Sequence, residues 1–266
     1  GGGNGPKSTM DKVTYASDTT AAVPGAALSA ARYSLAATGN STHGYFGGGG
    51  PGPKSTMDKV TYASDTTAQV PGAALSIAKR ALAATGNSTH GYFGGGGPSA
   101  VSTMDKTTYA SDTTAAVPGA ALSLARYGVG ATGNSTHGYF GGGTPGPVST
   151  MDKTTYASDT TAAVPGAALS AARRYMGATG ARANALPSIA PAPSSPATRF
   201  TDGAGLTPNT GYFGGGTPGP KSTMDKVTYA SDTTAAVPGA ALSVARKGLA
   251  ATGNSTHGYF GGGQDG

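Results

Sequence analysis

The sequence contains no cysteine, no tryptophan and no glutamate, so every acidic side chain is an aspartate. Without cysteine, the chain has no disulfide, no zinc-thiolate site and no thiol nucleophile. Only 11% of the residues are charged, and no apolar stretch approaches the ~20 residues of a membrane-spanning helix. The glycine-rich N-terminus lacks the basic and apolar regions of a signal peptide. These absences predict a soluble chain with no membrane span.

Glycine and proline, in contrast, are abundant, with 46 Gly and 18 Pro among 266 residues. Such a share borders on the composition of disordered or fibrous chains. However, 37% of the residues are apolar and 13 are tyrosines, placed at regular intervals along the chain. Stacked repeats with this composition bury enough surface to fold, so we expect a glycine-rich β protein.

The chain repeats itself with a period of 47 residues, and fixed periods of this kind indicate repeat architectures. The string Thr-Met-Asp-Lys begins at Thr9, Thr56, Thr103, Thr150 and Thr223. The string Gly-Tyr-Phe-Gly-Gly-Gly begins at Gly44, Gly91, Gly138, Gly211 and Gly258. The fourth unit is 26 residues longer than the others, and we expect residues 181–210 to form a loop insertion.

Each unit reads as four short strands separated by turn residues. In the first complete unit we expect them at residues 32–38, 44–47, 57–62 and 67–70. Four strands in about 40–50 residues are typical of a β-propeller blade. The sequence therefore predicts an all-β propeller of four-stranded blades.

The chain begins and ends inside a repeat unit. We expect continuous blades at 27–73, 74–120, 121–167 and 168–240. Residues 241–266 would supply strands one and two of a fifth blade, and residues 1–26 its strands three and four. A blade stitched in this way protects strand edges and closes the ring, so we predict five blades in a single domain. The alternative is a piece of a longer array.

Each unit resembles a kelch repeat. Arg32 opens the first strand, the pair Tyr45 and Phe46 leads into a glycine run, and a polar strand leads to a turn at Asp65. The tryptophan that follows this turn in kelch repeats is missing, and the glycine pair has grown to three or four. The strings are also similar to those in kelch-like repeats of virion structural proteins of marine phages. The resemblance implies a propeller on a virion surface or another extracellular structure.

Charged residues follow the repeat. One basic position opens the inner strand of every blade: Arg32, Lys79, Arg126, Arg173 and Arg246. We expect Asp–Lys and Asp–Arg pairs that tie blades together, and a ligand role for this basic ring is the alternative. The net charge of +6 is spread along the chain and favours an anionic partner such as an acidic glycan over nucleic acid.

Asparagine and histidine recur in the turn before Gly-Tyr-Phe, which a propeller places on one face. They are the candidate ligand-binding residues Asn40, His43, Asn87, His90, Asn134, His137, Asn254 and His257. Equivalent side chains of neighbouring blades would lie too far apart for metal–nitrogen bonds of about 2 Å, so we predict no metal site. The glycine runs precede Pro-Gly-Pro rather than a helix, which weighs against a phosphate-binding loop and a cofactor.

No catalytic pattern stands out. The chain has no Gly-x-Ser-x-Gly elbow, its histidines are related by the repeat, and it lacks glutamate, so we predict no enzymatic activity. The insertion at 181–210 breaks the symmetry, and we expect a partner-contacting arm with Arg182, Arg199 and Phe200. Elsewhere the units differ mainly after Leu-Ser, beside the basic site and in the glycine loop.

These features predict a non-catalytic module that binds surface glycans multivalently on a virion or a secreted structure. The alternative is a purely structural virion or filament subunit that contacts other coat proteins through the arm. Free sugar would compete only with the first function.

Overall fold

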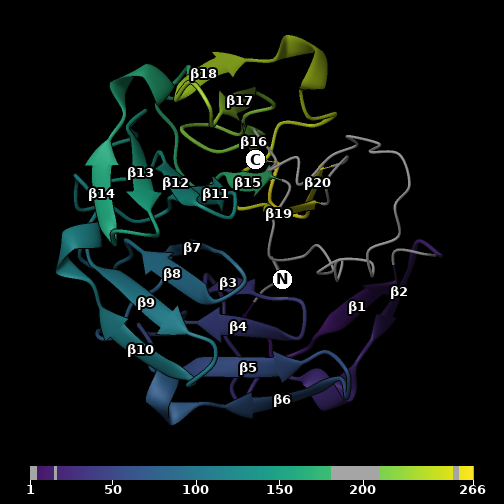
Figure 1. Cartoon of the computed structure of the whole chain (residues 1–266). Coiled ribbons are helices and arrows are strands. Elements are labelled where there is room, and N and C mark those ends of the chain that lie inside the picture. The colour runs from purple at the N-terminus through teal and green to yellow at the C-terminus, as the bar shows by residue number, and fades with distance from the viewer. Residues whose placement is uncertain (1–4, 15–16, 181–209, 254–257, 266) are drawn as a thin grey trace, which may run out of the picture.

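The computed structural model describes residues 5–14, 17–180, 210–253 and 258–265 (Figure 1). Within them the fold is all-β, with four four-stranded sheets and two two-stranded sheets. Consecutive strands pair antiparallel in every sheet. The predicted all-β class and the four-stranded repeat unit are therefore confirmed.

The strands recur at equivalent positions in each unit. The first complete sheet contains β3 (Ala36–Gly39), β4 (His43–Gly47), β5 (Met57–Thr61) and β6 (Thr66–Gln69). The second contains β7 (Ala83–Gly86), β8 (His90–Gly94), β9 (Met104–Thr108) and β10 (Thr113–Ala116). The third contains β11 (Gly130–Gly133), β12 (His137–Gly141), β13 (Met151–Thr155) and β14 (Thr160–Ala163). The fourth contains β15 (Gly177–Gly180), β16 (Thr210–Gly214), β17 (Met224–Thr228) and β18 (Thr233–Ala236).

The remaining elements of the described residues are two hairpins and five short turns. The hairpins are β1 (Asp11–Thr14) with β2 (Thr19–Ala22), and β19 (Ala250–Gly253) with β20 (Gly258–Gly261). The 3-10 turns are η1 (Pro24–Ala26), η2 (Pro71–Ala73), η3 (Pro118–Ala120), η4 (Pro165–Ala167) and η6 (Pro238–Ala240). No helix in the described ranges has the length and apolar character needed to cross a membrane.

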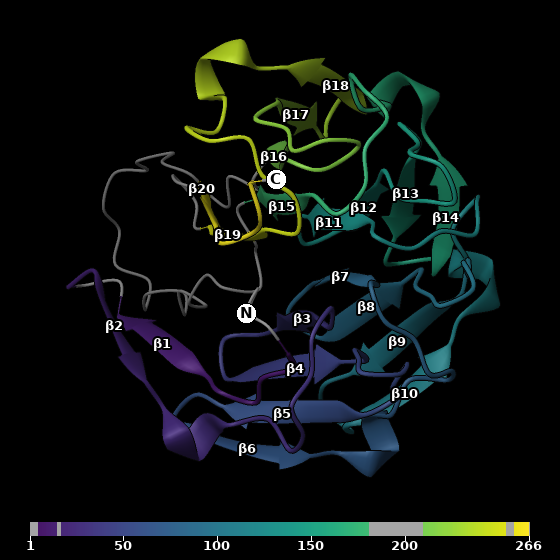
Figure 2. The same ribbon diagram turned by 180° about the vertical axis from the view of Figure 1, so that it is seen from behind.

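The sheets radiate from a common centre, as propeller blades do. The first strands of the units, β3, β7, β11, β15 and β19, lie innermost, and the fourth strands lie at the rim (Figures 1 and 2). Main-chain hydrogen bonds of 2.7–2.8 Å run from unit to unit at the centre. Each joins the N–H of one residue to the carbonyl of its equivalent in the preceding unit, along the series Ser34, Ala81, Gly128, Tyr175 and Gly248.

The inner strand is shorter than we expected. It covers Ala36–Gly39 instead of residues 32–38. Ser34 has a left-handed φ of 51°, which interrupts the extended backbone. Arg32 and Tyr33 consequently pair only through isolated bridges, to Lys7 and Gly50.

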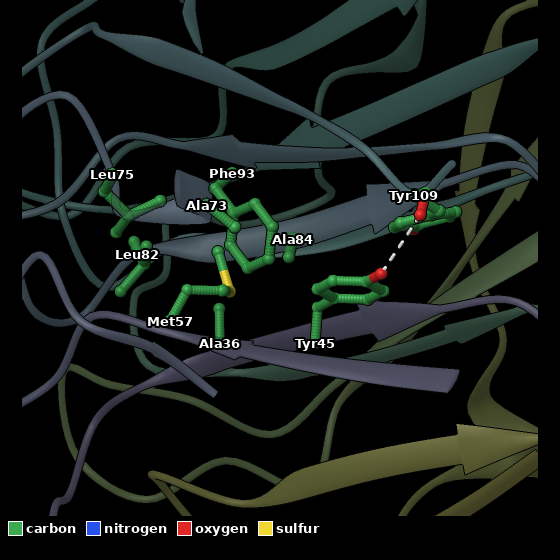
Figure 3. Close-up of a cluster of buried hydrophobic side chains, with 9 residues drawn as sticks. All are labelled: Ala36, Tyr45, Met57, Ala73, Leu75, Leu82, Ala84, Phe93 and Tyr109. Carbon is green, nitrogen blue, oxygen red and sulfur yellow. Dashed lines mark hydrogen bonds between the residues drawn. The ribbon is translucent and has the colours of Figure 1, made fainter. Parts of the chain in front are cut away.

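The apolar core lies between neighbouring blades. Figure 3 shows Tyr45 and Met57 of the first complete sheet facing Phe93 and Tyr109 of the second. The rings of Tyr45 and Tyr109 stack with centroids 4.8 Å apart. Met57 and Asp58 point to opposite faces of β5, and both are fully buried. Met57 packs against the second sheet, whereas Asp58 pairs with Arg32 of its own unit. Polar as well as apolar positions are therefore buried.

The two ends of the chain form separate hairpins. The hairpin β1–β2 adjoins the first complete sheet, where the ammonium of Lys12 lies 2.5 Å from Asp65 and Thr67 donates to the Ala26 carbonyl at 2.6 Å. The hairpin β19–β20 continues the inner ring beside β15. Within the described residues, β20 and β1 are not paired with each other. A fifth blade formed by both ends of the chain thus stays a prediction.

Candidate functional site

The turn between strands one and two is built around an asparagine. The side-chain oxygen of Asn40 accepts hydrogen bonds from the N–H of Thr42, the hydroxyl of Thr42 and the N–H of His43, each at 2.9 Å. The same three bonds recur at Asn87 and Asn134. The side-chain oxygen of this asparagine, which we predicted to be a ligand-binding residue, therefore stabilises the turn.

The adjacent histidine faces the junction between two blades. The Nδ1 atom of His43 lies 2.8 Å from the hydroxyl of Thr42, and the side chain is partly buried. Burial and the positive charge of Lys59 lower the pKa of His43 below its ordinary value, and Asp112 opposes them. His43 therefore shares this junction with a cation from its own blade and a carboxylate from the next.

An ion pair crosses the same junction. The ammonium of Lys59 lies 2.6 Å from Asp112, and the hydroxyl of Tyr45 donates to the same carboxylate. Although partial burial raises the pKa of Asp112, the hydrogen bonds from Lys59 and Tyr45 lower it below its ordinary value. The side chains of Lys59 and Asp112 remain 22% and 32% exposed, so a ligand in solution can reach both.

We call this cluster of histidine, lysine and aspartate the junction site. It occurs three times within the described residues: His43–Lys59–Asp112, His90–Lys106–Asp159 and His137–Lys153–Asp232. The fourth unit has Thr210 in place of the histidine, and Asn254 and His257 lie outside the described residues. The expected Asp–Lys pairs that tie blades together are confirmed.

Sequence reasoning named the histidine but not its partners. The lysine and aspartate of one junction site are 53 residues apart in sequence, a spacing that reflects the packing of one blade on the next. The only sequence signal for this contact was that both residues recur in every unit.

The basic ring lies inside the blades. Arg126, which is fully buried, donates to Asp152 at 2.6 Å and to the carbonyls of Gly142, Thr150 and Phe140 at 2.8–3.1 Å. Equivalent buried pairs link Arg32 to Asp58, Lys79 to Asp105 and Arg173 to Asp225. The expected Asp–Arg pairs are thus confirmed, although they tie parts of one blade rather than two blades. These four cations belong to the scaffold and do not face solvent.

Arg246, the fifth member of that ring, lies in the C-terminal hairpin region, where it is partly buried and bonds to the Gly262 carbonyl at 3.4 Å. The arm residues Arg182, Arg199 and Phe200 lie outside the described residues. The part of the chain that the structure describes brings together no three histidine or aspartate side chains able to hold a metal ion.

Comparison with protein-family models and with curated proteins finds no match for this chain. The resemblance to kelch repeats and to phage virion proteins therefore stays a prediction from the sequence.

Proposed function

We propose that this protein is a non-catalytic β-propeller that binds surface glycans multivalently, on a virion or another extracellular structure. The observation that carries the proposal is the recurrence of the junction site at three successive blade junctions. Each copy combines hydrogen-bond donors and acceptors that remain partly exposed, and sugar hydroxyls require both. Equivalent weak sites on one rigid body gain affinity through effective concentration.

A glycan-array screen of the purified chain tests this function. The triple variant His43→Ala, His90→Ala, His137→Ala removes the imidazole from every described junction site. We expect the wild type to bind one sugar class and the triple variant to lose at least about tenfold in apparent affinity, since avidity depends on the number of sites. The matched control is Gln69→Ala, an exposed substitution at the rim, which should bind as the wild type does.

A blank array, or a triple variant that binds as well as the wild type, would refute glycan binding at the junction sites. Concentration-dependent self-association that free sugar leaves unchanged would instead favour the structural subunit that contacts coat proteins.

We also propose that the ring closes as five blades. The support is the repeat itself: in the first complete sheet, Gly44 pairs with Val60 and Phe46 pairs with Asp58. The equivalent residues at the chain ends are Gly258 with Val13 and Phe260 with Asp11. This register would place Arg246 beside Asp11 as Arg32 lies beside Asp58. It would also allow the N–H of Ser34 to reach the Gly248 carbonyl and complete the central series of main-chain bonds.

The absence of native cysteine allows a direct test of closure. The double variant Lys12→Cys, Tyr259→Cys places two thiols at the positions equivalent to the directly paired Lys59 and Tyr45, where cross-strand Cα atoms lie about 4.5–5.5 Å apart. We expect a disulfide within one chain under mild oxidation in dilute solution. The control Val13→Cys, Tyr259→Cys would place its thiols on opposite faces of the paired strands and should stay reduced. Disulfides only between chains, or equal oxidation of both variants, would refute closure in this register.

A further inference from the structure

Two adjoining cavities open at the centre, where the loops before the inner strands meet. Their volumes are about 490 and 380 Å³, and they share Tyr33, Ser34, Ala81 and Tyr175 in their walls. The inner strand β3 begins near these residues and ends at the turn that carries His43. The cavities, which we call the central mouth, therefore lie at the opposite end of the inner strands from the junction sites.

The central mouth contains two of the positions at which the otherwise similar repeats differ. The position after the basic ring carries Tyr33, Arg80, Tyr127, Arg174 and Lys247. The next position carries Ser34, Ala81, Gly128, Tyr175 and Gly248. The buried Arg–Asp pairs and the junction sites, in contrast, recur with little change. A site with a single copy per ring needs such a break in symmetry, and the mouth has it.

The backbone at the mouth holds side chains in a conformation that disfavours them. Ser34, Ala81 and Tyr175 have φ values of 51–54°, in the left-handed region, and Gly128 and Gly248 occupy the equivalent position with φ of 65°. A non-glycine residue is disfavoured there because its Cβ crowds the following carbonyl oxygen. Residues held in sparsely populated backbone regions cluster at ligand sites, and Tyr175 is the one aromatic residue among the described non-glycine residues with a left-handed φ. The central series of main-chain bonds fixes the position of each of these residues.

The mouth combines aromatic and cationic side chains from successive units. A guanidinium N–H of Arg80 donates to the hydroxyl of Tyr33 at 3.3 Å. Arg174 lies over the ring of Tyr175 at 5.8 Å, and that ring is tilted against Tyr127 with centroids 6.3 Å apart. Lys247 lines the larger cavity from the C-terminal hairpin. Among the described residues that line the two cavities, none is acidic.

These aromatic and cationic side chains favour a ligand in which an anionic group is attached to a ring with an apolar face. Arginine and lysine bind carboxylate or sulfate oxygens through charge-assisted hydrogen bonds. Tyrosine offers a rigid apolar face with a polar tip, which suits the C–H face and the hydroxyls of a sugar ring. The cavities are in the size range of small-molecule sites and accommodate one or two sugar rings.

We propose that the central mouth is a separate binding site for an acidic glycan. Its anionic groups would lie against Arg80 in the smaller cavity and Lys247 in the larger one, and a sugar ring would lie against Tyr33 and Tyr175, which line both. The inference takes its ligand class from the proposed glycan function. It uses none of the residues of the junction sites, so either site can fail without the other.

The repeats themselves supply variants that the fold accepts. Arg80→Tyr introduces the residue found at the equivalent positions 33 and 127, and it removes one cation. Tyr175→Gly introduces the residue found at the equivalent positions 128 and 248, and it removes the aromatic face while relieving the left-handed backbone. The exposed rim substitution Gln69→Ala, which lies in neither proposed site, serves as the matched control.

Calorimetric titration of the full chain with a linear tri-glucuronate, and with the matching neutral tri-glucose, tests the proposal. We expect binding of tri-glucuronate that weakens with added salt, and a loss of at least about tenfold in affinity for Arg80→Tyr and for Tyr175→Gly. The Gln69→Ala control should bind as the wild type does. Equal binding of the neutral sugar would refute charge selection. Absence of tri-glucuronate binding, or wild-type affinity in both mouth variants, would refute the site, while array hits that depend on the histidines would leave the junction sites standing.

Discussion

Removal of the buried carboxylate Asp152 is expected to destabilise the protein strongly. Asp152 lies in the third complete sheet, is fully buried, and accepts from Arg126 at 2.6 Å and from the N–H of Ser123 at 3.2 Å. In the variant Asp152→Ala, the guanidinium of Arg126 would remain buried with carbonyl partners but no counter-charge. Breaking a buried ion pair by removing one partner costs about 3–5 kcal/mol, and we expect a loss in this range.

A second substitution at the same pair separates loss of charge from loss of hydrogen bonds. In the second sheet, Lys79 takes the place of arginine: its ammonium lies 2.8 Å from Asp105 and 3.2–3.3 Å from two carbonyls. Arg126 donates to three carbonyls, two of them at 2.8 Å. Arg126→Lys should therefore keep the ion pair and lose part of the hydrogen bonding, at a cost of about 1–2 kcal/mol.

Urea unfolding provides the assay, because urea leaves the ionic strength unchanged. The chain has no tryptophan, so circular dichroism and the fluorescence of its 13 tyrosines report unfolding. Repeat proteins can unfold in parts, and amide exchange in β11–β14 should show whether the loss is local to that sheet. The reasoning fails if Asp152→Ala unfolds at the wild-type midpoint, or if Arg126→Lys costs as much as Asp152→Ala.

Three further perturbations have expected outcomes that thermal or urea unfolding can check. Gly142→Ala should destabilise the protein far more than Gly146→Ala. Both glycines have φ of 66°, which costs alanine about 1–2 kcal/mol. A methyl group at 142 would also overlap the main chain of the next blade, whereas a methyl group at 146 would face open space. Similar losses would contradict this. Tyr139→Phe should cost about 1–2 kcal/mol, because it keeps the 4.7 Å stacking on Tyr229 and removes the 2.5 Å hydrogen bond to Asp232. A neutral effect would show that this bond contributes nothing. Stability should also fall in two stages between about pH 8 and about pH 3. Burial is the main reason why the folded-state pKa of His43, His90 and His137 is lowered. As the pH drops below the ordinary pKa of 6.5, these histidines bind protons more readily in the unfolded chain, so the folded state loses stability. Burial raises the pKa of Asp112, Asp159 and Asp232, but hydrogen bonds from lysine and tyrosine lower it on balance. Their contribution to stability is present above the ordinary pKa of 3.8 and is lost as the pH falls through the folded-state pKa. A stability profile that stays flat over this range would contradict both assignments.

Much of the fold was predictable from local patterns. The alternation in Met57–Thr61 and the Gly-Tyr-Phe-Gly string predicted strands, since the residues that form them and end them are neighbours in sequence. The length of the inner strand was not predictable, because Ser34 takes a left-handed conformation that main-chain bonds to the next unit hold in place. Sequence patterns do not report a constraint imposed by another blade.

The candidate sites, like the fold, were predictable from the sequence only in part. The recurring Asn40 and His43 were visible as a motif, but the roles of the charged residues around them were not. Asp58 and Asp112 both recur in every unit, yet the former is fully buried with Arg32, whereas the latter is 32% exposed beside Lys59. Their side chains are chemically identical, and only the packing of blades distinguishes them.

By itself, the sequence determined the period and the four short strands of each complete unit, because these depend on residues close together in the chain. Tertiary structure decided which polar groups lie inside the blades and which reach solvent. It also decided which residues meet at the central mouth, where Tyr33, Arg80 and Tyr175 come from three different units. The physical reason is that each blade is covered by its neighbours, so burial depends on contacts between residues one or more repeat lengths apart.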